Sequence, residues 1–140
     1  MFIKQLSIFV ENKFARLESI IDTLSKAGIN LRALSLAESH DYGVLRVIVD
    51  DAEKAKKALN EVGVIAKITD VVAVFLDDRS GGLASVLSIL KDAEISIEYM
   101  YAFLGRTEGK ALMVLKADDE AKTEKVLTEK NIPMLSQEDI

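Results

Sequence analysis

The sequence predicts an α+β protein made of two tandem copies of one βαββαβ unit. One observation is that identical residues recur at a constant spacing of 66 positions over about forty residues. A second is that the stretches typical of strands and helices follow the same order in both copies. The identical pairs are Phe9 and Phe75, Leu17 and Leu83, Ser19 and Ser85, Leu24 and Leu90, Ala27 and Ala93, Ile29 and Ile95, and Gly43 and Gly109.

The first copy opens with a strand and a helix. Residues Phe2–Val10 are rich in apolar, β-branched and aromatic side chains, which favours a strand. Gly28 provides a C-cap for the helix before it. That helix, Phe14–Ala27, carries an amphipathic stripe at Leu17, Ile20, Ile21 and Leu24.

The remainder of the first copy completes the pattern. Ile29–Glu38 and Val44–Val49 are expected to be strands joined by a turn at Ser39–Gly43. A helix is expected to start at Asp50 and Asp51 and to run through Val62. Acidic residues favour this position because the N-terminal end of a helix is positive. A closing strand is expected at Val64–Ile68.

The second copy repeats this order, and the chain therefore divides into units at residues 1–69 and 70–140. Such units are ferredoxin-like sandwiches, with helices on one face of each antiparallel sheet. The expected strands are Val71–Leu76, Ile95–Leu104, Lys110–Lys116 and Ile132–Leu135, the helices are Gly82–Ala93 and Asp118–Lys130, and the hairpin turn is Gly105–Gly109.

The connection between the two copies is very short. Only Thr69 and Asp70 separate the closing strand of one copy from the opening strand of the next. A few residues span about 10 Å, too little for the two copies of one chain to join through their second strands. We therefore expect either a tight hairpin at Thr69–Asp70 that exchanges closing strands between the copies, or pairing with another chain.

Composition excludes several function classes. The 140 residues include no cysteine and a single histidine, His40, so disulfides, thiolate metal sites and histidine dyads are excluded. A net charge of −5 without a basic stripe argues against nucleic acid. No apolar run is long enough for a membrane span, and the N-terminus does not resemble a signal peptide. We expect a cytoplasmic protein without metal or cofactor.

The βαββαβ fold serves many functions, so the residues must decide between them. A metal-carrying module needs a cysteine pair, and an RNA-binding module needs exposed aromatic residues on its central strands, which here carry side chains such as Ile8 and Val47. An acylphosphatase-like enzyme needs a glycine-rich anion loop with an arginine and an asparagine. Arg79 with Gly81 and Gly82 fits that loop in part, but the second copy lacks the asparagine.

The loop after the first strand of each copy is the best candidate site. Free amides at a helix N-terminus attract a carboxylate, and Gly81 and Gly82 permit close approach of a ligand. The ammonium of an amino acid could be bound by an acceptor from the loops. The alternative is an ordinary cap, with Ser80 as N-cap and Gly81 for the turn. The candidate acceptors are Glu11, Asn12, Asp77 and Asp78.

Residues Asp78–Leu83 resemble the Asp/Asn-basic-Pro-Gly-x-Leu loop of ACT domains, small regulatory modules that bind amino acids. The matching loop of the first copy is Asn12–Leu17, and the resemblance covers the whole chain as two tandem units. Ser80 and Phe14 stand where proline is usual, and Ala15 replaces the glycine. The resemblance implies effector binding at the seam between units that pair through their second strands.

The second strands differ between the copies. Alternate positions carry Ala33, Ser35 and Ala37 in the first copy and aromatic residues, including Tyr101, in the second. The two sites are therefore not expected to be equivalent. The aromatic rings fill a pocket, line a pocket, or pack in the core or at an interface. The turn at His40 to Tyr42 lies at the same end of the unit as the candidate loop, within reach of a ligand or simply solvated.

The sequence thus predicts a free-standing regulatory protein, not an enzyme, that binds an amino acid and forms a homodimer. An unidentified enzyme or regulator is the further partner to consider. The alternatives are a ligand-free association scaffold, a regulatory subunit and the acylphosphatase-like enzyme. The expected ligand-binding residues are Asn12, Lys13, Phe14, Ala15, Ser35, Leu36, Asp78, Arg79, Ser80, Gly81, Gly82, Leu83 and Tyr101.

Overall fold

A computed structural model describes residues 1–39 and 41–140. The chain divides into two compact units, an N-terminal unit of Lys4–Thr69 and a C-terminal unit of Asp70–Ile140 together with Met1–Ile3. The elements are β1 (Ile3–Glu11), α1 (Arg16–Lys26), β2 (Leu31–Glu38), β3 (Tyr42–Val49), α2 (Ala52–Glu61), β4 (Ala66–Asp77), α3 (Gly82–Asp92), β5 (Ile97–Ala102), β6 (Lys110–Ala117), α4 (Glu120–Glu129) and a short 3₁₀ helix, Gln137–Asp139.

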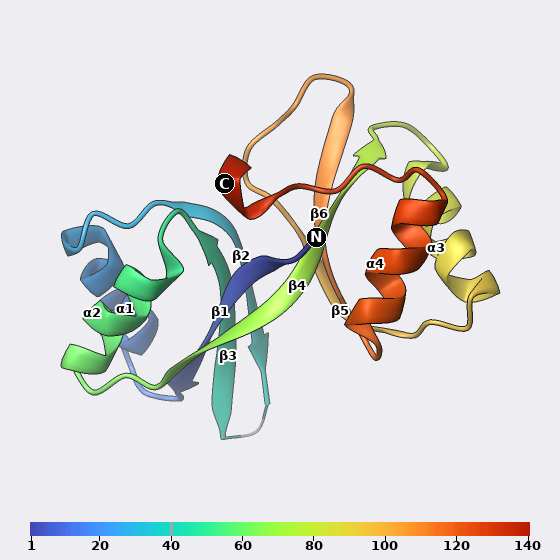
Figure 1. Cartoon of the computed structure of the whole chain (residues 1–140). Coiled ribbons are helices and arrows are strands. Elements are labelled where there is room, and N and C mark those ends of the chain that lie inside the picture. The colour runs from blue at the N-terminus through green and yellow to red at the C-terminus, as the bar shows by residue number, and fades with distance from the viewer. Residues whose placement is uncertain (40) are drawn as a thin grey trace. The chain divides into compact units, whose positions relative to one another are not determined.

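The N-terminal unit is a βαββαβ sandwich. Its strands pair in the order β2-β3-β1-β4, and β3 is antiparallel to both β1 and β2. The helices α1 and α2 lie together on one side of these strands (Figure 1). The core between the sheet and the helices contains fully buried side chains such as Leu6, Ile8, Leu45 and Leu59.

The C-terminal unit has the same plan, with strands in the order β4-β6-β5 and the helices α3 and α4 on one side (Figure 1). Phe75 N donates to the Pro133 carbonyl at 2.9 Å, next to a bridge between Val74 and Met134. The strand expected at Ile132–Leu135 is therefore reduced to this bridge, because Pro133 has no amide hydrogen to extend the ladder. The α+β class with two ferredoxin-like units is confirmed.

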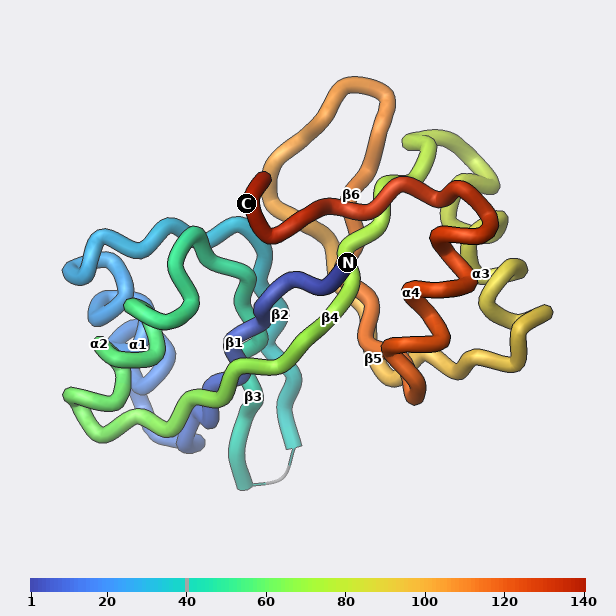
Figure 2. The backbone as a smooth tube through the Cα atoms, in the orientation of Figure 1, coloured from blue at the N-terminus to red at the C-terminus, as the bar shows by residue number. Residues whose placement is uncertain are grey.

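The connection between the repeats is the main correction to the predicted fold. No hairpin forms at Thr69–Asp70, because β4 runs through these residues without reversing (Figure 2). The closing segment of the N-terminal unit stays in its own unit, where Phe9 N donates to the Ile65 carbonyl at 3.1 Å. The exchange of closing strands is therefore wrong. The β-branched residues on either side of the connection favour a continuous strand over a turn.

The start of the second helix in each unit confirms the duplication at atomic detail. The carboxylate of Asp51 accepts a hydrogen bond from the Lys54 amide at 3.1 Å. In the C-terminal unit, Asp119 accepts from the Lys122 amide at 3.0 Å. Both aspartates are N-caps in extended backbone conformation, so the acidic residues expected at these helix starts act as caps.

Candidate functional site

The loop from β1 to α1 leaves the N-terminus of the helix without a side-chain cap. Lys13 N donates to the Glu11 carbonyl at 2.8 Å, and Arg16 N donates to the Lys13 carbonyl at 3.2 Å. Ala15 then takes the left-handed conformation with φ of 60°, so the helix begins at Arg16 and not at Phe14. Beyond Arg16, the first-turn amides of α1 have no acceptor within the helix and can receive an anion.

The loop from β4 to α3 has the same hydrogen bonds 66 positions later. Arg79 N donates to the Asp77 carbonyl at 2.9 Å, and Gly82 N donates to the Arg79 carbonyl at 3.0 Å. Gly81 is the N-cap residue, with φ of 88° and no side-chain cap. The expectation that Ser80 is the N-cap is therefore wrong, because the left-handed residue that starts the helix is Gly81.

The two glycines of this loop have different roles. A Cβ added to Gly82 would lie 2.0 Å from the Asp77 carbonyl oxygen, so this glycine allows the chain to approach its own backbone. A Cβ added to Gly81 would meet no atom within 4 Å. The space beside Gly81 is therefore open, while Gly82 is used for packing of the loop.

Two of the four candidate ammonium acceptors are already paired. Glu11 accepts from Lys13 Nζ at 2.8 Å, and this hydrogen bond holds the pKa of the Glu11 carboxyl below its ordinary value. The Lys110 ammonium beside Asp77 likewise lowers the pKa of Asp77, with a smaller contribution from Arg79. The loops therefore gather positive charge around these carboxylates.

A pocket of about 200 Å³ lies under the β1–α1 loop. Its floor is formed where three neighbouring strands meet, because Gly43 is directly opposite Val10 on β1 and Glu38 on β2. Asn12 and Lys13 border it from the loop. The remaining lining residues are Glu11, Leu17, Leu36 and Tyr42.

The edge of this pocket is partly aromatic. The ring of Tyr42 lies 5.7 Å from the ring of Phe9, centroid to centroid, and both rings are about half exposed. Leu17 reaches the pocket from α1, and Leu36 reaches it from β2. The site therefore combines an apolar wall with the carboxylate of Glu38 and the amide side chain of Asn12.

The C-terminal unit has a second pocket of about 290 Å³ at the equivalent place. Asp78 and Ala102 in its lining occupy the positions of Asn12 and Leu36 in the repeat. Its charge differs, since it carries two cations and no counterpart of Glu38. The lining residues are Asp78, Ala102, Phe103, Gly105, Arg106, Lys110, Ala111 and Leu112.

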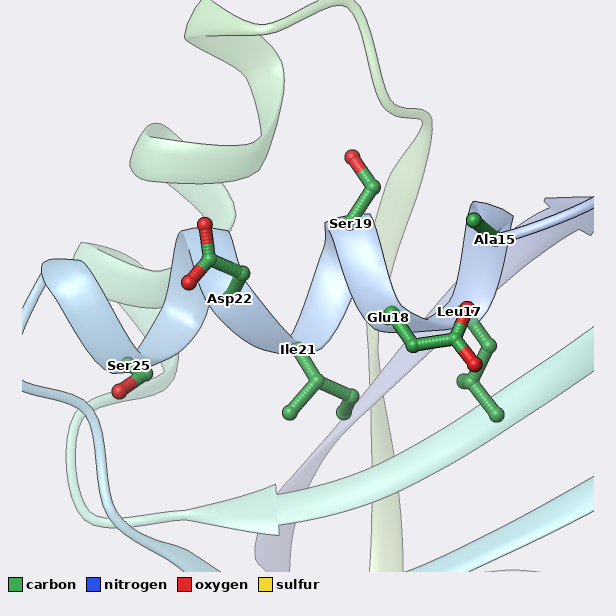
Figure 3. Close-up of a pocket in the computed structure, with 7 residues that line it drawn as sticks. All are labelled: Ala15, Leu17, Glu18, Ser19, Ile21, Asp22 and Ser25. Atoms are coloured by element: carbon green, nitrogen blue, oxygen red, sulfur yellow. The ribbon is translucent and has the colours of Figure 1, made fainter.

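A third depression of about 840 Å³ is an open groove along α1. Figure 3 shows Leu17, Glu18 and Ile21 pointing away from the helix on one side and Ser19 on another. The groove also includes Ala15, Asp22 and Ser25 (Figure 3). It shares Leu17 with the pocket under the loop and continues from it along the helix.

The structure brings some of the expected site residues together and separates others. Asn12, Lys13 and Leu36 line the N-terminal pocket, Asp78 lines the C-terminal one, and Ala15 borders the groove. The expected residues that line none of these pockets are Phe14, which is fully exposed, Ser35, Arg79, Ser80, Gly81, Gly82, Leu83 and Tyr101.

A β-bulge explains why Leu36 and not Ser35 reaches the pocket. The register of β2 against β3 shifts between Leu31 and Ala33, which changes the face on which each later side chain lies. The same shift occurs between Ile97 and Tyr99 on β5. Tyr101 is only 8% exposed and stacks on Tyr99 at 6.5 Å, outside the pocket of its unit.

Several lining residues of the N-terminal pocket were not among the expected ligand-binding residues. Leu17 and Gly43 were signalled by their identity in both repeats, to Leu83 and Gly109. Glu38 carried no such signal, since its position depends on the bulge. Tyr42 was expected within reach of a ligand and does line the pocket; His40, named with it, lies outside the described residues.

Within residues 1–39 and 41–140, no group of three or more metal-binding side chains comes together. Among the helices of the same residues, none has the length and apolar character needed to cross a membrane.

Comparison with known proteins identifies the family. No curated protein matches. Protein BT0572 from Bacteroides thetaiotaomicron is 42% identical, with a TM-score of 0.93 over 99% of this chain and 95% of that chain. The regulatory subunit of aspartate kinase from Thermus thermophilus, in a ligand-free form, has a TM-score of 0.61 at 14% identity over 90% of each chain, which shows a shared fold. The family model described as "ACT domain pair" matches residues 1–140, and the chain therefore belongs to the ACT domain pair family.

Proposed function

We propose that this chain is a non-catalytic regulatory protein of the cytoplasm that binds a free amino acid in the pocket under the β1–α1 loop. The observation that carries the proposal is the charge arrangement of this pocket. It places a cation and a helix N-terminus beside a carboxylate, which matches the two charges of a zwitterion.

The carboxylate of the ligand would be bound at the start of α1. The amide of Leu17 lies in the first turn, where helix amides have no partner within the helix. Lys13 donates to Glu11 through one hydrogen, and its ammonium has two further hydrogens for a ligand.

The ammonium of the ligand would be bound by Glu38, with the side-chain carbonyl of Asn12 as a second acceptor. Glu38 has no ion-pair partner among the described residues, so its charge is available. The side chain of the ligand would then pack on Leu17 and Leu36. A pocket of about 200 Å³ is below the usual size range for larger ligands and suits one small molecule.

The C-terminal pocket would bind a ligand differently. Arg106 and Lys110 offer a carboxylate two cations, and Asp78 offers an ammonium one acceptor. The side chain of the ligand would contact Phe103 and Leu112. The two pockets are therefore expected to differ in affinity or in ligand preference.

Regulation would follow from a ligand that binds one state of the protein better than another. Support comes from membership of the ACT domain pair family and from the fold shared with a regulatory subunit of aspartate kinase. We infer that the chain acts as a homodimer and that an enzyme or regulator reads its state.

The test is thermal unfolding of the intact protein with each of the twenty amino acids at millimolar concentration. A ligand present at 100 times its Kd stabilises the folded state by about 2.7 kcal/mol, which shifts Tm by several degrees. The shift should be lost in Glu38→Gln and kept in Glu61→Gln, a substitution on the exposed surface of α2. No shift with any amino acid would contradict the proposal and favour a ligand-free association scaffold.

A further inference from the structure

The sheet of the N-terminal unit has one face that its helices do not cover. Both α1 and α2 lie on the other side of the strands (Figure 1). On β1, the side chains of Leu6, Ile8 and Val10 belong to the core under the helices. Because side chains alternate along a strand, Ser7 and Phe9 lie on the opposite side, which we call the open face.

An apolar row crosses the open face. Phe9 is opposite Val44 on β3, and Val44 is opposite Ala37 on β2. On the other side of Phe9, its amide donates to the Ile65 carbonyl at 3.1 Å, just before β4 begins. Both sequence neighbours of Ile65 are core residues, so its side chain is on the open face. Phe9 is 49% exposed and Ile65 is 68% exposed, so the row is accessible from solvent.

A second aromatic ring lies beside this row. Tyr42 is two residues before Val44 on β3 and therefore shares its face. Its ring centroid is 5.7 Å from that of Phe9, with an angle of 50° between the ring planes. Two accessible rings on neighbouring central strands form a surface on which a planar ring can stack.

The next row of the open face is polar and basic. Ser7 on β1 is opposite Arg46 on β3, and Arg46 is opposite Ser35 on β2. Lys67 on β4 has sequence neighbours that pack in or against the core, so it lies on the open face, where it is exposed. Lys67 makes no ion pair with the described residues. This basic row, made of these four residues, therefore offers two cations to an anion that lies beside the rings.

We propose that the open face of the N-terminal unit binds single-stranded RNA. Bases stack on Phe9 and Tyr42, and the phosphates that follow them lie beside Arg46 and Lys67. In modules of the same βαββαβ fold that bind RNA, bases stack on aromatic side chains of the sheet in the same way. Phosphates provide the negative charge that the basic row complements.

The side chains that argue against RNA in the sequence lie on the other face of the sheet. Ile8 and Val47 are core residues under the helices, so they do not describe the surface that a ligand meets. The net charge of −5 belongs to the whole chain, whereas a strand of RNA contacts only the local basic row. Neither observation therefore excludes RNA from the open face.

The shape of the open face favours a strand over a small molecule. None of the three pockets described above includes Phe9, Ile65 or Lys67, so a small ligand would bury little of its own surface there. Ser7 Oγ accepts from Gln5 Nε2 at 3.0 Å, so the Ser7 hydroxyl can donate its own hydrogen to a ligand. A ribose 2′-hydroxyl, which DNA lacks, is an acceptor for it.

The equivalent face of the C-terminal unit lacks the basic row. Leu112 on β6 occupies the position of Arg46, and Leu135 occupies the position of Lys67. Leucine thus replaces both cations. RNA binding is therefore expected in the N-terminal unit alone.

Fluorescence anisotropy of a labelled RNA strand of about eight nucleotides, titrated with the intact protein, measures binding. A dissociation constant of about 10–100 μM is expected at low salt. Phe9→Ala should weaken binding about tenfold, and Phe9→Tyr, which keeps a ring, should retain it. The matched control is Phe14→Ala, which removes a fully exposed ring from the β1–α1 loop and should bind like wild type.

The salt dependence of binding tests the basic row. Two phosphate contacts predict a slope of about −1.4 for the logarithm of the binding constant against that of the salt concentration, or about sevenfold weaker binding between ~50 and ~200 mM salt. Lys67→Ala should reduce the slope to about −0.7. Lys57→Ala, on the exposed surface of α2, should leave it unchanged. Equal slopes for Lys67→Ala and wild type would contradict the basic row.

Four results would overturn the proposal. One is no binding at about 500 μM protein, and another is equal weakening by Phe9→Ala and Phe14→Ala. A third is a mononucleotide that competes as strongly as the strand, or a DNA strand of the same sequence that binds as tightly. The fourth is loss of self-association in Phe9→Ala without RNA binding by wild type, which would assign the open face to a second copy of the chain.

The proposal does not depend on the amino-acid pocket, and the two can fail separately. Lys67 does not line that pocket, so Lys67→Ala should keep the shift of Tm with an amino acid. Glu38 is not on the open face, because Leu36 and Leu45, opposite each other, lie on the helix side. Glu38→Gln should therefore keep RNA binding; its loss in this variant would contradict the placement of the RNA.

Discussion

The replacement Gly82→Ala tests whether the β4–α3 loop is built on a close approach of the chain to itself. The new Cβ would lie 2.0 Å from the Asp77 carbonyl oxygen and 3.1 Å from its carbonyl carbon. Both atoms belong to the backbone, so the start of α3 must move away from the end of β4. Overpacking that a side chain can relieve costs about 1–3 kcal/mol, and we expect a loss of about 3 kcal/mol here.

The neighbouring Gly81→Ala is the matched control. Its Cβ would meet nothing within 4 Å, so only the left-handed conformation, with φ of 88°, opposes the change. That conformation costs a non-glycine residue about 1–2 kcal/mol. Ala15 takes the equivalent conformation in the N-terminal unit, which shows that the fold accepts alanine at this place.

Urea unfolding followed by tyrosine fluorescence measures both variants. Two of the three tyrosines, Tyr99 and Tyr101, lie in the C-terminal unit, and the chain has no tryptophan. The midpoint of this transition should fall more for Gly82→Ala than for Gly81→Ala. Equal losses in the two variants would refute the close-approach argument.

Two further predictions concern stability. Asp51→Ala removes the N-cap of α2 and should lower the free energy of unfolding by about 1 kcal/mol in urea titrations, as should the equivalent Asp119→Ala; a loss in one unit only would contradict the duplication of the cap. Burial raises the pKa of Glu120, so the folded state binds this proton more tightly than the unfolded state does, and the ionised form opposes folding at neutral pH. Glu120→Gln should therefore raise the free energy of unfolding at pH 7, and this gain should shrink as the pH falls through the raised pKa; a gain that grows toward acid pH would contradict the assignment.

The repeat and its helices and strands could be predicted because their signals are local. The stripe from Leu17 to Leu24 marks α1, and the identical glycines at 43 and 109 mark equivalent turns. The predicted hairpin at Thr69–Asp70 is wrong because it rests only on the short distance that the linker can span. The residues of that connection, with β-branched side chains at Ile68 and Thr69, instead favoured the continuous strand that forms.

The candidate site could be predicted only in part. Asn12 and Lys13 follow from their place after the first strand, and both line the pocket. Glu38 could not be identified, because the bulge at Arg32 decides which face of β2 each residue occupies, and no sequence signal marks that bulge. The role of Gly82 was also hidden, since a glycine that packs on backbone and one that admits a ligand look alike in sequence.

Backbone NMR of the full chain tests the central claim most directly, because amide shifts report where an added amino acid binds. The account predicts that at least one amino acid moves the amide signals of Asn12, Lys13, Glu38 and Gly43 in a saturable way, with weaker changes on the surface of α2. If every amino acid leaves these four signals in place, or shifts them no more than those of α2, the pocket under the β1–α1 loop is not an amino-acid site.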